Sequence, residues 1–303
     1  MQRWLPRYRP RADRRPRTPR AGSGLQIRWL GTAAHVVQSE TTTLLLDPFL
    51  SRPGLLRTAF RPLVPTPDRW WHWLPERIDA ICCGHSHYDH LLDAPEIAKR
   101  SNALLFGSRT TAAFARAHGV AEDRIVEVPA DGLVQQVGDI TVRFVPSLHG
   151  RIALGRVPFP GEVPEASLPA RLHHYKMGGA FGVHLTTPFG SVYHNGSADL
   201  VDAELQDLKA DVLLAGLAGR NATRNYLSRM IRHLSPRLFV PTHHDLFFAP
   251  LETGLRLLPG VALDRFAAEV LREAPRGRVV SPTYEDVLVV PEGDVRDAAF
   301  APL

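Results

Sequence analysis

The segment His85-Ser86-His87-Tyr88-Asp89-His90 constrains this sequence more than any other feature. It places three imidazoles and one carboxylate within six residues, directly after the apolar run at residues 78–83. A strand that ends in a tight loop can turn His85 and His87 toward one point, and Asp89 and His90 toward a neighbouring point. Imidazole and carboxylate groups suit zinc, with iron or manganese as alternatives. The pattern therefore predicts a metal centre at a strand end, rather than a histidine-rich surface loop.

The overall composition is that of a globular protein, but the charge is unevenly distributed. The 303 residues are 44% hydrophobic and 22% charged, with a formal net charge of +5. Residues 1–20 hold eight arginines and one aspartate, so the positive charge belongs to the start of the chain. Residues 1–24 also mix proline with these arginines and lack apolar periodicity, so we expect a disordered tail. An alternative is that the tail contacts acidic surfaces, either lipid or nucleic acid.

Two further properties bound the class of protein. No stretch approaches the roughly 20 apolar residues that a bilayer-spanning helix needs, and the tail lacks the apolar region of a secretory signal. We therefore expect a cytoplasmic protein. The two cysteines, Cys82 and Cys83, are adjacent, which excludes a disulfide framework.

The pattern of apolar runs and turn residues predicts strands in two series, each interrupted by helices. The first series opens with a three-stranded meander at residues 25–30, 36–38 and 42–46. Residues 51–75, rich in proline and tryptophan, predict a long insertion that either lines a hydrophobic pocket or buries its own aromatics. We expect residues 25–303 to form a single domain, and residues 279–290 to add strands to its second half. The predicted helices include residues 95–100, 110–118, 202–208 and 222–234.

The HxHxDH motif resembles the signature of the metallo-β-lactamase fold superfamily of metallo-hydrolases. Trp29-Leu30-Gly31-Thr32 and Leu44-Leu45-Leu46-Asp47-Pro48 resemble the opening meander of one branch of that superfamily. This branch includes ascorbate-6-phosphate lactonase-like and N-acyl-phosphatidylethanolamine phospholipase D-like members. Val145-Pro146-Ser147-Leu148-His149 and Pro241-Thr242-His243 are similar to the segments that supply later histidine ligands. The resemblance implies an α+β, four-layer αββα sandwich, with two mixed sheets face to face, helices outside and the site at one sheet edge.

The same resemblance implies two divalent metal ions, most simply zinc, each held by three side chains. The first triad is His85, His87 and His149, and the second is Asp89, His90 and His243. Two such ions lower the pKa of a shared water, so that it attacks without a side-chain base. Asp89 is then the expected catalytic residue, because an aspartate can return the proton.

One position departs from the family pattern. The family places a bridging aspartate directly after a glycine, but Ser197 follows Gly196 here and Asp199 lies two residues further on. Three alternatives remain open: Asp199 reaches back to bridge the metals, the bridge is absent and the site is asymmetric or binds one metal, or Asp199 caps a helix that begins near residue 201.

Other polar residues near these motifs are candidates for supporting roles. Asp47, His194, His244 and Asp245 could hold a ligand in place or contact substrate, or they could be structural residues. His173, His174 and Tyr175 could face the metals from a lid.

The leading hypothesis is a metal-dependent hydrolase that uses a metal-activated water on an ester, lactone or phosphodiester bond of a small-molecule or lipid-like substrate. A mono-iron dioxygenase of the same fold also keeps the HxHxDH pattern and is the redox alternative. A nuclease is a third alternative, although nuclease relatives usually carry an additional domain and only about fifty residues follow Pro250. We expect no stable nucleic-acid partner.

Overall fold

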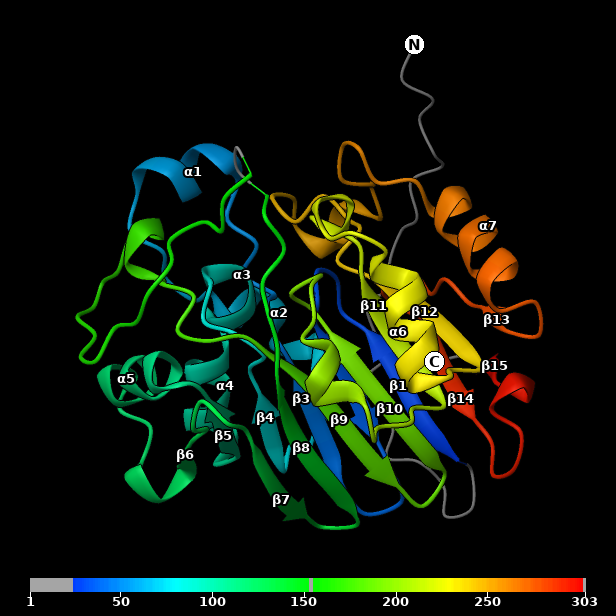
Figure 1. Ribbon diagram of the computed structural model, residues 1–303. Coiled ribbons are helices and arrows are strands. Elements are labelled where there is room, and N and C mark those ends of the chain that lie inside the picture. The colour runs from blue at the N-terminus through cyan, green and yellow to red at the C-terminus, as the bar shows by residue number, and fades with distance from the viewer. Residues whose placement is uncertain (1–23, 153–154, 302–303) are drawn as a thin grey trace.

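Two mixed β-sheets lie face to face in the computed structural model, with helices on both outer faces (Figure 1). The structure describes residues 24–152 and 155–301, so the expected tail lies outside the described residues except for Gly24. The α+β sandwich that the sequence predicts is therefore confirmed.

The first sheet has eight strands in the order β15-β14-β1-β2-β3-β4-β5-β6. Neighbouring strands are antiparallel from β15 to β3 and parallel from β3 to β6. Its strands are β1 Leu25–Trp29, β2 His35–Gln38, β3 Thr43–Leu46, β4 Ala80–Cys82, β5 Leu104–Gly107, β6 Ile125–Glu127, β14 Val287–Val290 and β15 Ala299–Ala301. The predicted meander is present as β1 to β3.

The second sheet has seven strands in the order β13-β12-β11-β10-β9-β8-β7. Strands β7 to β10 are antiparallel, whereas β10 to β13 are parallel. Its strands are β7 Leu133–Val137, β8 Ile140–Pro146, β9 Phe181–Thr187, β10 Gly190–Asn195, β11 Val212–Gly216, β12 Leu238–Thr242 and β13 Arg278–Val279.

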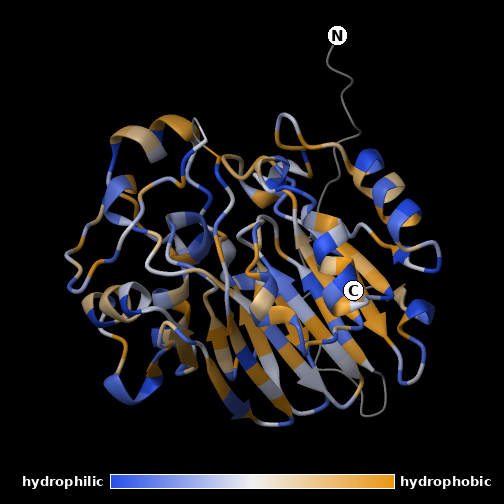
Figure 2. Ribbon diagram, viewed as in Figure 1, coloured by the Kyte–Doolittle hydropathy of each residue, from blue (hydrophilic) through white to orange (hydrophobic). Residues whose placement is uncertain are grey.

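Alternation along the strands divides the buried apolar residues into three layers. In β3, Leu44 and Leu46 pack between the sheets, while Leu45 faces the outer layer. In β11, Leu214 points into the inter-sheet layer and Leu213 away from it. Because β3 and β11 are buried on both faces, they read as continuous apolar runs, and Figure 2 shows apolar segments on strands of both sheets. This pattern requires helices on both sides.

Helices supply those two outer layers. Ile97 of α4 and Phe114 of α5 pack against the first sheet, whereas Met230 of α6 and Phe266 of α7 pack against the second. The α-helices are α1 Leu55–Phe60, α2 Pro67–Trp70, α3 Tyr88–Leu91, α4 Ala94–Ser101, α5 Arg109–His118, α6 Tyr226–Leu234 and α7 Leu263–Glu273. The 3-10 helices are η1 Trp71–Trp73, η2 Glu122–Arg124, η3 Leu172–His174, η4 Asp202–Leu205, η5 Arg220–Ala222, η6 Leu251–Thr253 and η7 Val295–Asp297. Within the described part of the chain, no helix has the length and apolar character needed to cross a membrane.

The insertion at residues 51–75 both buries aromatic side chains of its own and presents apolar surface. Trp70 and Trp73 are buried in the outer core of the first sheet, and the Trp70 indole donates to the Ser51 hydroxyl at 2.9 Å. In contrast, Leu56 and Phe60 of α1 are exposed. The tryptophans therefore anchor the insertion, and α1 presents an apolar surface.

Two predicted segments differ from the structure. Residues 279–290 do not all join the second half: β14 pairs with β1, with Val290 opposite Leu25, and so belongs to the first sheet. An unpaired β1 would be an exposed sheet edge, and β14 covers it while burying Leu288 between the sheets. The helix predicted at residues 202–208 is only the 3-10 turn η4.

We expect Leu288→Ala to lower the free energy of unfolding by about 2–5 kcal/mol, because it removes a side chain from the inter-sheet core. Urea denaturation followed by circular dichroism measures this change. Leu271→Ala is the matched control, because Leu271 is 54% exposed on α7 and should change stability by less than about 0.5 kcal/mol. Equal effects of the two substitutions would contradict the placement of β14.

Candidate metal centre

The site lies where strand ends from both sheets meet. In the first sheet, the parallel strands β3 and β4 lead directly to Asp47 and to the loop that carries His85. In the second sheet, β8, β10 and β12 run in one direction, and they lead to the loops of His149 and Ser197 and to His243. Strands that share a direction bring their following loops to the same edge. Chain segments far apart in sequence therefore converge at one edge of the sandwich.

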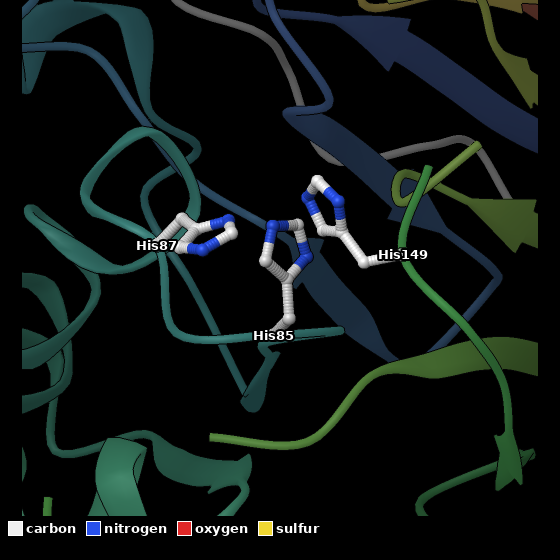
Figure 3. Close-up of side chains that lie close together, drawn as sticks. All are labelled: His85, His87 and His149. Atoms are coloured by element: carbon white, nitrogen blue, oxygen red, sulfur yellow. The ribbon is translucent and has the colours of Figure 1, made fainter. Parts of the chain in front are cut away.

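The first predicted triad is gathered into a compact cluster. The ring centroids of His85 and His87 are 4.8 Å apart, and each ring is 4.7 Å from that of His149. One nitrogen from each ring lies within 4.8 Å of the others. Figure 3 shows the three imidazoles side by side around a common point. This arrangement can hold one metal ion.

The second triad lies beside the first. The short helix α3 begins directly after His87 and carries Asp89 and His90 on one turn. Asp89 Oδ2 is 3.3 Å from His243 Nε2 and 3.9 Å from His90 Nε2. The rings of His85 and His90 are 3.8 Å apart, so the two triads adjoin. The structure thus brings together all six side chains that the resemblance assigns to two metals.

Several ring nitrogens of the triads are buried and have no hydrogen-bond partner in the described chain, as expected of residues that bind a metal ion. Both ring nitrogens of His85 and Nδ1 of His243 are buried, and no described residue offers any of them a hydrogen bond. Leaving such groups unpaired costs roughly 1–3 kcal/mol each. A neutral imidazole has a single lone pair, so coordination of a cation would satisfy one of the two nitrogens of His85. The donor set therefore fits a divalent metal ion.

Backbone carbonyls select which nitrogen of two ligands remains free. His87 Nε2 lies 2.8 Å from the Pro158 oxygen, and His149 Nδ1 lies 2.7 Å from the Gly150 oxygen. A carbonyl oxygen only accepts, so each of these nitrogens carries the proton. Nδ1 of His87 and Nε2 of His149 therefore keep the lone pairs that can bind metal.

The electrostatics of the site favour the metal-binding protonation states. Burial, followed by the neighbouring His87, lowers the pKa of His149 to about 3. Burial and the adjacent histidines also lower the pKa of His85 well below its ordinary value. Burial alone would raise the pKa of Asp89, but His90 and His243 hold it below the ordinary value. Burial would lower the pKa of His90, but Asp47 and Asp89 raise it above the ordinary value. The first triad thus offers neutral imidazoles at His85 and His149, and the second offers an ionised carboxylate.

Asp47 supports the second triad from behind. Its Oδ2 accepts a hydrogen bond from His90 Nδ1 at 2.8 Å, and its Oδ1 accepts from the Gly84 amide at 2.6 Å. A carboxylate in this position fixes the ring orientation and leaves His90 Nε2 for a metal. A Cβ at Gly196 would lie 2.7 Å from Asp47 Oδ2, which explains the glycine there. Asp47 thus acts on a ligand, as one of its sequence interpretations expected.

The structure does not bring Asp199 to the triads. Its Oδ1 accepts from the Leu200 amide at 2.8 Å and lies 3.9 Å from Arg229 Nη1. It does not cap a helix either, because η4 begins at Asp202 with Val201 at its N-cap. The interpretations of Asp199 as a bridging ligand and as a helix cap are therefore corrected. The remaining alternative, a site without a bridging aspartate, agrees with this geometry.

A buried charge network holds the loop that carries His243. Asp245 accepts from the Thr32 amide at 2.8 Å, from Arg52 Nη2 at 2.6 Å and from the Tyr284 hydroxyl at 2.8 Å. The Thr32 carbonyl in turn accepts from the His243 amide at 2.6 Å. His243 has φ of 52°, a strained conformation for a residue other than glycine. Asp245 therefore supports the backbone of the loop that carries His243. It does not orient a ligand ring, which was one of the roles that the sequence allowed.

Arg52 and Tyr284 could not be identified from the sequence, because they join this network from segments distant in the chain. The neighbouring histidines are also outside the ligand groups found among the described residues. His244 stacks on Trp29 with centroids 4.3 Å apart, and His194 Nε2 lies 2.9 Å from the Ala33 oxygen. Both residues pack against the first strands of the chain, although both ring nitrogens of His244 are buried without a partner in the described chain.

A cavity of about 440 Å³ opens onto both triads. Its floor includes the ligands His87, Asp89, His90, His149 and His243. Its walls are mostly apolar and include Leu55, Phe159, Leu172, Leu217, Phe247 and Val261. Of the proposed lid residues, Tyr175 lines the cavity, whereas His173 and His174 do not. The site thus combines a polar metal-binding floor with apolar walls.

Comparisons of the sequence agree with this geometry. The profile described as "Beta-lactamase superfamily domain" matches residues 42–246. A protein of Pyrobaculum neutrophilum named "UPF0173 metal-dependent hydrolase" is 27% identical over 229 residues, covering 74% of this chain and 85% of that protein. Its counterpart MK1542 of Methanopyrus kandleri is 28% identical over 232 residues, covering 75% and 87%. Neither name points to the lactonase-like and phospholipase D-like branch, so that narrower assignment stays a prediction.

Solved structures share the fold. Igni18, a metallo hydrolase of Ignicoccus hospitalis, aligns with a TM-score of 0.55 at 18% identity, covering 92% of this chain and 99% of that one. CmlA, a diiron β-hydroxylase of Streptomyces venezuelae, aligns with a TM-score of 0.57 at 14% identity, covering 93% and 54%. At these identities the likeness concerns the fold alone, and the two names describe different chemistries. The reaction must therefore be argued from the site.

We expect Asp47→Asn to weaken zinc binding by about 10–100-fold, because the amide is a poorer acceptor for His90 Nδ1 and no longer fixes that ring. Competition with a chromophoric chelator measures the affinity. Asp139→Asn is the control, because Asp139 accepts from Ser39, which lies at the opposite end of β2 and β3 from Asp47. Unchanged zinc affinity in Asp47→Asn would contradict the supporting role.

Proposed function

Since the chain belongs to the family described as the beta-lactamase superfamily domain, we propose that it is a metal-dependent hydrolase. The observation that carries this proposal is the convergence of two adjacent triads on a cavity, with buried imidazole nitrogens that lack protein partners. The names of the Pyrobaculum and Methanopyrus relatives support it. Zinc is the metal we propose, because the donors are imidazoles and a carboxylate.

Divalent ions in such a site would activate a water as nucleophile and polarise the carbonyl or phosphoryl group that it attacks. His85, His87 and His149 would hold one ion. Asp89, His90 and His243 would hold the other. The apolar walls limit water in the cavity, which strengthens every electrostatic interaction at its floor.

Asp89 is the residue that we assign to proton transfer. Its carboxylate is ionised, borders the cavity and lies 3.3 Å from His243 Nε2. One carboxylate oxygen would hold a metal ion, and the other would return a proton to the leaving group. Asp47 keeps His90 in place during this transfer.

We propose an ester, lactone or phosphodiester with an apolar or lipid-like body as the substrate. Leu55 lines the cavity although it is 60% exposed, and Leu56 and Phe60 on the same helix are 75% and 68% exposed. Figure 2 shows α1 as an apolar helix at one extremity of the molecule. Such apolar surface beside a cavity suits an apolar substrate.

The cavity offers little to a nucleic acid. Within the described chain, no lysine or arginine lines it, and a phosphate backbone would require such residues. We therefore propose a small-molecule or lipid-like substrate without a stable nucleic-acid partner. Contact of the arginine-rich tail with acidic surfaces, and a cytoplasmic location, stay predictions.

The variant His87→Ala should lose one zinc ligand and lower hydrolysis by more than about 100-fold, which exceeds the effect of losing a supporting residue. The assay is a zinc-loaded screen over lactones, phosphodiesters and acyl esters, with zinc content measured by mass spectrometry. His118→Ala is the control, because His118 lies on α5 and its Nδ1 contacts only the Phe114 carbonyl.

Retained hydrolysis in His87→Ala would contradict the assignment. Metal analysis of protein purified without added metal separates the redox alternative. Bound iron together with oxygen consumption would favour a mono-iron dioxygenase.

Replacing Leu55 by glutamate should raise KM for a long-chain acyl ester by about tenfold, because the acyl chain would cover the exposed Leu55, and burial of a leucine side chain contributes about 1.5–3 kcal/mol. KM for the acetyl ester of the same alcohol should change by less than about twofold. Leu271→Glu provides the matched control, because Leu271 is 54% exposed and does not line the cavity. Equal effects on both chain lengths would contradict an apolar substrate wall at α1.

A further inference from the structure

The two metal triads are poor in negative charge. Asp89 is the one anionic side chain among their six members, and one further carboxylate, that of Asp47, lies within 4.8 Å of ligand atoms of His85 and His90. Both oxygens of Asp47 already accept hydrogen bonds from the protein, and Asp199 faces Leu200 and Arg229. Two divalent ions would therefore bring more positive charge than the nearby carboxylates balance. A further anion at the cavity floor would be stabilised.

Ser197 lies where such an anion would be received. It is only 3% exposed, it lines the same cavity, and its Oγ has no hydrogen-bond partner in the described chain. A buried hydroxyl without a partner costs free energy unless a ligand supplies one. A hydroxyl can donate to an anion, which an ionised aspartate in its place could not do.

The backbone around Ser197 is held firmly. The Ser197 carbonyl accepts from the Gly150 amide at 2.7 Å, and the Ala198 carbonyl accepts from Thr223 Oγ1 at 2.9 Å. Ala198 also forms a β-bridge with the ligand His149. These contacts place the hydroxyl beside the first triad without help from its own side chain. Little ordering remains when it binds a ligand.

A second hydroxyl in the cavity has the same property. Tyr175 is 1% exposed, lines the cavity, and its hydroxyl also lacks a hydrogen-bond partner among the residues described. Its ring stacks on Phe114 with centroids 4.5 Å apart, which fixes its direction. A rigid hydroxyl without a protein partner is expensive to bury unless a ligand in the cavity supplies an acceptor.

We propose that Ser197 marks an anion subsite at the floor of the metal cavity, which takes the negatively charged oxygen of an amphiphile whose apolar body lies along the walls. This inference rests on the proposed function and narrows its substrate class. A phosphodiester carries the anion in the scissile group, whereas an ester or lactone releases it as the carboxylate product.

Three probes with the same chain test the subsite: octyl phosphate, octanoate and the neutral octanamide. Isothermal titration to the zinc-loaded full-length protein should show at least one anion binding about tenfold or more tightly than octanamide, because a hydrogen bond to a charged group has about this effect. Preference for octyl phosphate supports the phosphodiester class, and preference for octanoate supports the ester or lactone class.

The variants separate the role of Ser197 from general attraction by the metals. Ser197→Ala should lose about tenfold in affinity for the preferred anion and leave octanamide unchanged. Ser281→Ala, at an exposed position, is the matched control and should change neither affinity.

Ser197→Asp gives a readout that does not depend on activity. Its carboxylate would fill the subsite, so zinc should resist removal by a chelator about tenfold better, and the preferred anion should bind about tenfold less tightly. This variant also covers the case in which Ser197→Ala fails to fold.

Two results overturn the subsite while the proposed function stands. One is equal binding of the three probes by zinc-loaded protein whose hydrolysis depends on His87. The other is an anion preference that both Ser197 variants leave unchanged. Protein that binds no zinc and hydrolyses nothing in the screen would overturn the proposed function, and the subsite with it.

Discussion

Buried imidazole nitrogens without protein partners are the constraint around which this molecule is arranged. The rings of His85, His87 and His149 lie within 4.8 Å of one another, and both nitrogens of His85 lack a partner within the described residues. Packing neutral imidazoles this closely leaves lone pairs that water cannot reach. A shared cation satisfies several of them at once, which a protein hydrogen-bond donor could not do.

The strand directions of the sandwich bring these side chains together. The ligand loops follow strands that run in one direction within each sheet, so that their side chains arrive at one edge. The strain that this convergence creates is concentrated there: Asp47 and His243 adopt left-handed backbone conformations at the ends of β3 and β12. Hydrogen bonds from Gly84 to Asp47 and from His243 to Thr32 compensate for that strain.

The cavity joins two environments that normally disfavour each other. Its floor concentrates positive charge once metal is bound, while its walls are apolar and carry no lysine or arginine in the described chain. A low-dielectric surround strengthens the electrostatic contacts at the floor. An amphiphile with one polar end satisfies both environments, whereas a uniformly charged polymer satisfies only one. Because Ser197 stands where the family pattern has an aspartate, it adds no negative charge to the floor.

The sequence by itself determined the candidate ligands and the apolar strands. The HxHxDH spacing and the continuous apolar strands are local patterns that depend on neighbouring residues and on strand alternation, whereas His149 and His243 follow from the resemblance to the superfamily. Only the tertiary structure decided that Asp199 turns toward Arg229, that β14 covers β1, and that Arg52 and Tyr284 meet at Asp245. These outcomes depend on contacts between segments up to hundreds of residues apart. The free energy of such contacts is set by packing and burial, which no short stretch of sequence encodes.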